Sequence, residues 1–188
     1  CSSDLGGTLS NLGQNSIQCN IYATDGNTVV GTLETSKPYV GFICKYDFIG
    51  NFDYILKIDG SNDVNLSSLA IDSDNNLYVG CSLTGTRANI YATDGSTIVK
   101  TIDIDPILLD GSNRQGFIVK YDNNGTYLDM WKTNLALQNM KINSDNVLLG
   151  YGVKPENNNG DFIDSNNMKV SSLIHQDSNF GFFVYNQE

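Results

Sequence analysis

A six-residue segment, Ile-Tyr-Ala-Thr-Asp-Gly, occurs twice in this chain, at residues 21–26 and 90–95. A heptad, Gly-Phe-Ile-Cys-Lys-Tyr-Asp at 41–47, returns almost unchanged at 116–122, and Gly-Phe-Phe-Val-Tyr at 181–185 is similar enough to be a third copy. The copies keep one order and recur at a period of roughly 70 residues. This repetition constrains the fold most, because similar units adopt similar structures and bury their apolar faces against one another.

Weaker correspondences extend the repeat along the chain. Residues 69–75 (Leu-Ala-Ile-Asp-Ser-Asp-Asn) are echoed by 140–146 (Met-Lys-Ile-Asn-Ser-Asp-Asn), and 162–167 occupy the third position of the first motif. Residues 1–19 align without gaps onto 63–81, which predicts that the chain opens at the first hairpin of a unit. We therefore expect repeat units at 1–62, 63–134 and 135–188, two of them complete and the third partial.

The middle unit predicts an all-β fold. Its short apolar segments alternate with turns rich in Asn, Asp and Gly, and no helical periodicity competes with them. Phe117, Val119 and Tyr121 share one face of a strand, and the first unit keeps this stripe as Phe, Cys and Tyr, so we expect the same face to be buried in each unit. Strands are expected at 68–71, 77–83, 89–92, 97–102, 117–121 and 127–132.

Four strands plus an extra hairpin in a unit of about 70 residues fit a β-propeller-type blade. One such sheet cannot cover both of its own faces, so neighbouring blades must stack on it. Because a closed propeller has about four to eight blades, three units predict part of a larger propeller, a ring completed by self-association, or an open stack. The first of these is favoured by a chain that starts and stops inside the repeat frame.

The segments 67–80 and 116–125 together resemble the bacterial β-propeller repeat family, in which an Ala-x-Asp-x-x-Gly-Asn-x-Tyr-Val-x-Gly hairpin precedes a Phe-x-x-Lys-Tyr-Asp-x-x-Gly strand. The variant with an Ile-Tyr-x-x-Asp-Gly hairpin is similar to repeats in surface or particle proteins of large DNA viruses. This chain departs from the pattern at Asn75-Asn76, where the family has Gly, and in the third unit, which lacks the Lys and Tyr of the heptad. The resemblance implies a propeller fold and carries no catalytic residues.

Composition excludes several functions. The net charge of −10 and the scattered basic residues disfavour a nucleic-acid partner. No apolar run is long enough to span a membrane. The lone histidine, His175, excludes a multi-histidine metal site and has no triad partners beside it, so we expect no catalytic residues; a propeller-scaffold hydrolase or lyase is the least favoured function.

The four cysteines, Cys1, Cys19, Cys44 and Cys81, show no Cys-x-x-Cys spacing. Cys44 aligns with Val119 and Val184 and is expected to be a small core residue, and Cys19 and Cys81 fall at equivalent points of two units. Their disulfide state stays open. Cys1-Ser-Ser also resembles the mature start of a bacterial lipoprotein, but the repeat frame favours a chain cropped from a longer one.

Calcium is the one cofactor that the sequence raises. Asp72, Asp74 and Asn76 have the alternating oxygen ligands of a Ca²⁺ loop, but the Gly and the terminal carboxylate of a full loop are missing. The second copy reads Asn143-x-Asp145-x-Val147 and loses a ligand. A plain hairpin turn without metal is the favoured interpretation.

Two hypotheses for function follow. The favoured one is a non-catalytic structural or interaction scaffold at the surface of a large virus particle or a cell, with other protein subunits or further blades as partners. The alternative is a lectin-like propeller, for which Tyr127 and Trp131 are the candidate glycan-binding residues, although core packing also explains them.

Overall fold

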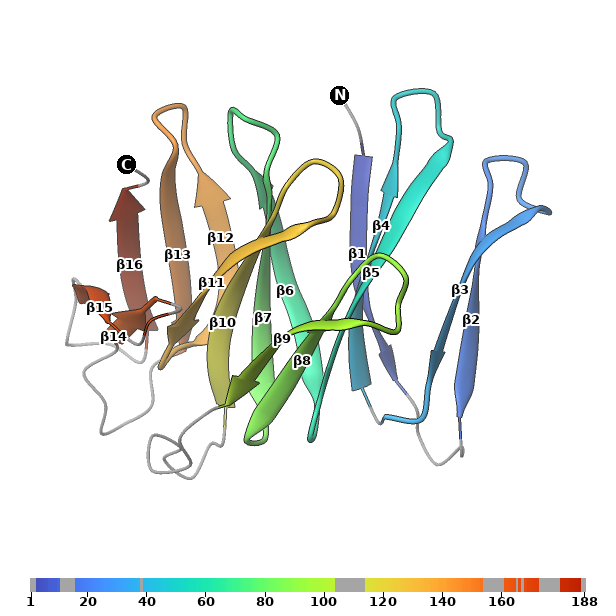
Figure 1. Cartoon of the computed structure of the whole chain (residues 1–188). Helices are drawn as coiled ribbons and strands as arrows, with labels where there is room; N and C mark the ends of the chain where they lie inside the picture. Colours follow the sequence, from blue (N-terminus) through green and yellow to red (C-terminus); the bar gives the residue numbers. More distant parts are fainter. Residues whose placement is uncertain are drawn as a thin grey trace.

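The computed structural model describes residues 3–10, 16–37, 39–103, 114–153, 161–164, 166, 168–172 and 180–186. The described residues form strands and turns without any helix, as the sequence predicts. Three antiparallel meander sheets stand side by side in a row, with strand β1 (Ser3–Ser10) in one outer sheet and β16 (Phe180–Asn186) in the other (Figure 1). A fourth, two-stranded sheet of β2 (Ile17–Tyr22) and β3 (Val29–Thr35) lies beyond the sheet of β1. The described part is an open stack of blade-like sheets rather than a closed ring.

The middle sheet has the four-stranded blade form, in the order β6-β7-β10-β11. Each strand pairs with the next one in an antiparallel meander. Strand β7 is buried along almost its whole length, as its apolar sequence predicts for a central strand. The strands are β6 (Val64–Ile71), β7 (Leu77–Thr84), β10 (Arg114–Tyr121) and β11 (Tyr127–Thr133).

The two outer sheets each contribute three strands of the same meander among the described residues. The first sheet has the order β1-β4-β5 and the third sheet β12-β13-β16. Their strands are β1 (Ser3–Ser10), β4 (Tyr39–Tyr46), β5 (Phe52–Gly60), β12 (Ala136–Ile142), β13 (Val147–Val153) and β16 (Phe180–Asn186).

A hairpin is inserted between the second and third meander strands of each unit. The inserted hairpin β8–β9 adds to the outer strand of the preceding sheet, where β8 pairs with β5, and β14 pairs with β11 in the same way. The hairpin β2–β3 forms a sheet of its own in the described part of the chain. The strands are β2 (Ile17–Tyr22), β3 (Val29–Thr35), β8 (Arg87–Tyr91), β9 (Ile98–Asp103), β14 (Asp161–Ile163) and β15 (Lys169–Ser172).

The pairing of β1 corrects the sequence alignment at the start of the chain. Gly7 pairs with Phe42, as Cys81 pairs with Phe117, so β1 takes the place of β7 and not of β6. The gapless alignment of 1–19 with 63–81 is therefore wrong, because sequence similarity at a turn does not fix which strand a segment pairs with. The equivalence of Cys19 with Cys81 is wrong for the same reason: Cys19 lies on the inserted hairpin β2–β3.

The strand register of β16 in the third unit differs by one residue from the sequence prediction. Tyr185 pairs with Leu148, the position at which Tyr121 pairs with Leu77, so the heptad tyrosine is present in the third unit. Val184 consequently takes the register of Lys120 and not that of Val119. A shift of one residue turns every side chain of a strand to the opposite face, and the repeated Gly-Phe pair in the sequence conceals it.

Two cores fill the spaces between the sheets. The first lies between the first and middle sheets, and the predicted stripe of Phe117, Val119 and Tyr121 is fully buried there. The second core lies between the middle and third sheets and contains Ile118 and Trp131, which point the other way. We call the face with the stripe the front face of a sheet and the opposite one its back face. Each interface joins the back face of one sheet to the front face of the next.

The predicted burial of the stripe holds less well in the first sheet. Cys44 is buried, but Phe42 and Tyr46 are only half-buried, because the described residues place only the hairpin β2–β3 near this face, where Tyr46 donates its hydroxyl to the Tyr22 carbonyl. The packing between sheets also explains the glycine that begins the heptad. A Cβ on Gly116 would stand 2.3 Å from the Leu135 carbonyl oxygen.

Candidate interaction surface at the inserted hairpins

The hairpin β8–β9 joins two sheets. Its first strand continues the first sheet, with Ile58 opposite Ile90 and Gly60 opposite Ala88. Ala88, Ile90 and Ile102 are buried in the core between the first and middle sheets. The recurrent Ile of the Ile-Tyr-Ala-Thr-Asp-Gly motif is therefore an anchor that inserts the hairpin between two blades.

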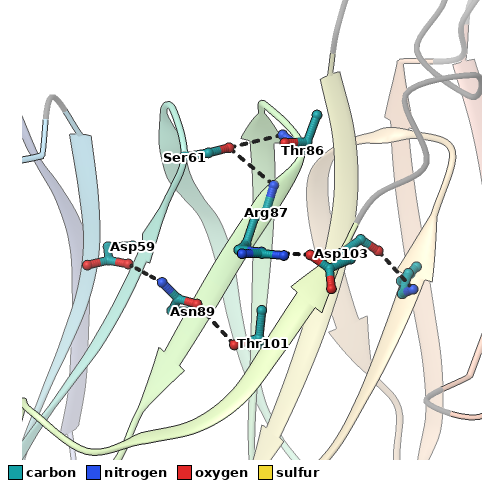
Figure 2. A network of polar contacts seen from close by, with 8 residues as sticks. Asp59, Ser61, Thr86, Arg87, Asn89, Thr101 and Asp103 are labelled. Atoms are coloured by element: carbon teal, nitrogen blue, oxygen red, sulfur yellow. Dashed lines mark hydrogen bonds and ion pairs between the residues drawn. The ribbon is translucent and has the colours of Figure 1, made fainter.

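Polar contacts fix the root of this hairpin (Figure 2). Asn89 donates its side-chain amide to Asp59 of β5 at 3.2 Å and accepts the Thr101 hydroxyl at 3.1 Å. Ser61 Oγ accepts the backbone N–H groups of Thr86 and Arg87 at 3.0 and 3.2 Å. These contacts tie the outer strand of the first sheet to the start of the hairpin.

The second strand of the hairpin, β9, contacts the middle sheet. Lys132 of β11 donates its Nζ to the backbone carbonyl of Asp103 at 3.1 Å. The side chain of Asp103 forms an ion pair with Arg87 at 2.7 Å. Both of these side chains are well exposed, so the pair fixes geometry more than it adds stability.

Tyr91 extends the network on the first sheet. Its hydroxyl donates to Asp59 at 2.9 Å, and the ammonium group of Lys57 lies 3.8 Å from the centre of its ring. Burial, together with the Asp59 carboxylate, raises the pKa of Tyr91 to about 12. Burial also lowers the pKa of Lys57, against the opposing effect of Asp59. The tyrosine therefore remains a neutral donor, and the ring contact with a cation adds to the anchoring.

The Asp-Gly turns of the motif have a shared structure. Asp94 accepts the backbone N–H groups of Ser96 and Thr97 at 2.8 Å each, and Gly95 has a φ of +70°. Asp25 and Gly26 repeat this arrangement in the hairpin β2–β3. The hydrogen bonds, led by that from the Thr97 hydroxyl, lower the pKa of Asp94 to about 2. The repeated Thr-Asp-Gly sequence is thus explained by the turn that it builds.

Apolar side chains accompany these acidic turns at the surface. On β9, Ile98 and Val99 are exposed, and on the hairpin β2–β3 Tyr22 and Val29 are exposed. Met168, which follows the turn between β14 and β15, is exposed as well. Each inserted hairpin consequently presents an apolar surface beside a turn, at a position that recurs from blade to blade. We call this set the hairpin surface.

The sequence did not identify the hairpin surface as a candidate site. Its signal was present, because Ile-Tyr-Ala-Thr-Asp-Gly is the most exact repeat of the chain. The repeat alone does not predict that Ile98 and Val99 are exposed, because β-branched residues in a strand are buried as readily as they are exposed.

The predicted glycan-binding pair does not form one platform. Trp131 is only 4% exposed and lies in the second core, stacked between Tyr78 and Phe162 with ring centres 6.0 and 6.3 Å away. Tyr127 is half-buried against the first core, on the front face of the same sheet. A glycan role for the two residues stays a prediction, and the indole has no open face for a sugar in this arrangement.

The predicted calcium ligands lie in a hairpin turn. Asp72 Oδ1 accepts the N–H groups of Asp74 and Asn76, and Oδ2 accepts the Asn76 side-chain amide at 2.9 Å and faces Lys120 Nζ at 3.5 Å. Burial tends to raise the pKa of Asp72, but these hydrogen bonds and Lys120 lower it overall. Asp74 is exposed.

Four other hairpins build the same turn with an Asp or Asn at its first position. In each, one side-chain oxygen accepts the N–H groups two and four residues further on. The shared geometry accounts for the Asp-x-Asp-x-Asn spacing as a turn, while a calcium site at these residues stays a prediction. The first residues of these turns are Asp47, Asp122, Asn143 and Asp164.

The remaining titratable groups carry no recognisable site. Cys44 and Cys81 are buried, and burial raises the pKa of both thiols, that of Cys44 to about 11. Within the described ranges, no three His, Cys, Asp or Glu side chains come together as metal ligands do. Nor does that part of the chain contain a helix suited to crossing a membrane. His175 and Cys1 lie outside the described residues.

Comparison with known proteins supports a propeller-type repeat. No family model matches the chain. Over 145 residues, which are 71% of the chain, the sequence is 32% identical to an uncharacterized WD repeat-containing protein of Acanthamoeba polyphaga mimivirus. The matching stretch is 10% of that viral protein, so the chain spans about a tenth of its length. The similarity agrees with the stacked blade-like sheets of the structure.

Proposed function

We propose that the chain is a non-catalytic interaction scaffold whose inserted hairpins bind protein partners. The observation that carries this proposal is the hairpin surface on β8–β9, where Ile98 and Val99 are exposed on a hairpin that polar contacts anchor at its root. Exposed apolar residues on a fixed framework are typical of protein-binding surfaces.

The polar residues support a structural role in place of a catalytic one. Asp59 binds Asn89 and Tyr91, and Asp72 binds its own turn and Lys120. These carboxylates are used to fix strands and turns. The similarity to a viral WD repeat-containing protein is compatible with a repeat scaffold. We further propose a location at the surface of a virus particle or of a cell, which the resemblance to repeats of large DNA viruses implies.

The proposal is tested by comparing a double variant of the hairpin with a single control variant. Both replace exposed apolar residues with Thr. Ile98→Thr with Val99→Thr removes apolar surface from the hairpin and keeps β-branched residues in the strand. Leu128→Thr is the matched control, because Leu128 is similarly exposed but lies on β11, outside the hairpin surface. Each immobilised protein is incubated with the same cell extract, and the captured proteins are quantified.

We expect the wild type and the control to capture at least one protein in similar amounts. The hairpin variant should capture about tenfold less of that protein. Capture that does not differ among the three proteins would refute the role of the hairpins. Glycan-array binding that is lost in Trp131→Ala, at unchanged thermal stability, would favour the lectin hypothesis instead.

A further inference from the structure

We infer that Cys19 and Cys44 are a redox-sensitive thiol pair, which closes to a disulfide between the hairpin β2–β3 and the first sheet. Both thiols are free in the structure, which therefore describes the reduced form of the pair. The inference goes beyond the proposed function and does not depend on it, because the exposed side chains of the hairpin surface take no part.

The hairpin β2–β3 lies against the front face of the first sheet. Tyr46 of β4 donates its hydroxyl to the Tyr22 carbonyl of β2 at 3.2 Å. The methyl group of Thr24, which follows β2, lies against Gly50 in the turn that follows β4. The C-terminal ends of β2 and β4 are therefore in contact, and the hairpin stands beside this sheet (Figure 1).

The alternation of side chains along the two strands places both thiols at this contact. Cys44 shares the front face of β4 with Tyr46, two residues further on, and is 2% exposed. Cys19 shares one face of β2 with the buried Ile21 and pairs with the buried Leu33 of β3. The two thiols therefore lie on facing surfaces of the sheet and the hairpin.

The second unit places its hairpin in the same way. The methyl group of Thr93 lies against Gly125, in the turn that follows β10. Ile90 and Ile102 of the hairpin β8–β9 share the first core with the stripe of the heptad. An inserted hairpin thus packs its apolar face on the front face of its own unit in both cases.

The same unit shows that the positions of the two cysteines belong to one core. By strand register, Cys19 corresponds to Ala88 of β8, and Cys44 corresponds to Val119 of β10. Ala88 and Val119 are fully buried, and both lie in the first core. Two apolar residues of the second unit are therefore both replaced by cysteine in the first unit, at positions that face one another across the hairpin contact.

The acidity of the thiols agrees with this pairing. Burial, and after it the nearby Cys19 thiol, raise the pKa of Cys44 to about 11. Burial alone raises the pKa of Cys81, which is fully buried on β7 of the middle sheet. Among the described cysteines, Cys44 is thus influenced by Cys19 and not by Cys81.

The pair closes by thiol–disulfide exchange with a small-molecule disulfide such as oxidised glutathione. Cys19 is the more exposed thiol, so its thiolate attacks the reagent, forms a mixed disulfide and displaces one thiolate. Cys44 then loses its proton and attacks Cys19 Sγ, which displaces the second thiolate. Two thiols of the chain become one disulfide, the disulfide of the reagent becomes two thiols, and the two protons pass from the chain to the displaced thiolates.

Closure joins the hairpin to its sheet covalently. A disulfide stabilises a fold mainly because it restricts the unfolded chain, here between residues 19 and 44. Oxidation should therefore fix the hairpin β2–β3 on the first sheet, and reduction should leave it held by noncovalent contacts alone.

The pair is tested in the full chain with Cys1→Ser, so that the remaining thiols are those whose positions the structure describes. The single variants Cys19→Ala and Cys44→Val introduce the residues that the second unit has at these positions, which keeps the contact apolar. Thermal melting shows whether each variant is folded.

Each protein is equilibrated with mixtures of reduced and oxidised glutathione, natively and in urea. Its remaining thiols are then labelled with N-ethylmaleimide in denaturant, and the mass of the intact chain gives the number of labels. Cleavage after Glu34 separates Cys19 from Cys44, so a disulfide between them joins the fragments 1–34 and 35–156.

We expect oxidation to remove two labels from the Cys1→Ser chain and to join the two fragments, and neither single variant should form this link. The equilibrium constant for closure should be at least tenfold greater in the native chain than in urea, because the fold holds the two thiols together. The melting temperature of the oxidised chain should rise by about 5 °C or more, whereas the single variants should melt alike in both conditions.

Three results would overturn the inference. An equilibrium constant that is no greater in the native chain than in urea would show that the fold does not bring the thiols together. A link that persists in folded Cys44→Val would identify Cys81 as the partner of Cys19. A chain that stops at the mixed disulfide of Cys19 with glutathione would show that Cys44 cannot reach it.

Discussion

At the scale of single residues, the glycines that begin the heptad show how closely the sheets stack. Gly41 and Gly116 begin equivalent strands, and each is crossed closely by the next unit. A Cβ on Gly41 would stand 2.2 Å from Leu66 Cδ1, and one on Gly116 would stand 2.3 Å from a backbone oxygen. Sheet stacking, and not a turn, therefore requires glycine at position 116, whereas the side chain of Leu66 could move away from a Cβ at position 41.

Gly116→Val should lower the free energy of unfolding by about 3 kcal/mol, the upper part of the range for overpacked sites. The side chain would displace the backbone at Leu135 as well as Leu137. Thermal or urea melting measures the loss. Gly31→Ala is the control, since its Cβ would meet only the ring of Phe52, and an equal loss in both variants would argue against the stacking explanation.

The carboxyl group of Asp94 should titrate at a lower pH than an ordinary aspartate, because its own turn binds the ionised form. Its pKa in the folded chain, about 2, lies below the ordinary value of 3.8, because the ionised carboxylate accepts three hydrogen bonds of the turn. The carboxylate thus stabilises the hairpin fully above pH 3.8, and this contribution is lost as the pH falls from there through about 2.

The amide signals of Ser96 and Thr97, followed by NMR, should report this titration with a midpoint near pH 2. In Asp94→Asn the same signals should not titrate. A midpoint near 3.8 in the wild type would contradict the hydrogen-bonded turn.

At the scale of elements, the inserted hairpins are equivalent in sequence but not in surroundings. Strand β8 is paired on both edges, with β5 and with β9, whereas β2 is paired with β3 alone within the described residues. Their motifs are identical over six residues. The difference between the two hairpins therefore arises from the neighbouring sheet.

Amide hydrogen exchange should reveal that difference. We expect the backbone amides of Ala88, Asn89 and Ile90 to exchange more slowly than those of their counterparts on β2, residues 19–21, because the β5 edge protects β8. Equal protection of the two strands would contradict the open edge of β2.

At the scale of the whole molecule, the three sheets behave as a short linear array. The first core joins strands of the first and middle sheets with the hairpin β8–β9, and the second core joins the middle sheet to the third. In such an array, stability is a sum of unit and interface contributions, so one interface can be weakened separately.

Leu148→Ala should weaken the second interface by about 2–5 kcal/mol, because it removes a fully buried side chain. We expect exchange to rise in β12, β13 and β16 first, while Val79 and Val119 in the first core stay protected. Uniform acceleration over all three sheets would show that the chain unfolds as one cooperative unit.

Local features of the chain could be predicted from the sequence. The strands of the middle unit, the buried stripe at Phe117 and the turns after Asp72 and Asp122 follow from period-two patterning and from turn residues that act within five positions. These properties depend on short-range sterics and hydrogen bonds, which is why a single sequence contains them.

Strand partners were decided by the tertiary structure. That β1 pairs like β7, that Tyr185 takes the place of Tyr121, and that β8 adds to the preceding sheet are contacts between residues far apart in the chain. A one-residue slip leaves the sequence pattern nearly unchanged but exchanges the faces of a strand, so only packing between sheets selects the register. The same packing determines which apolar residues stay exposed, and with them the surfaces available to a partner.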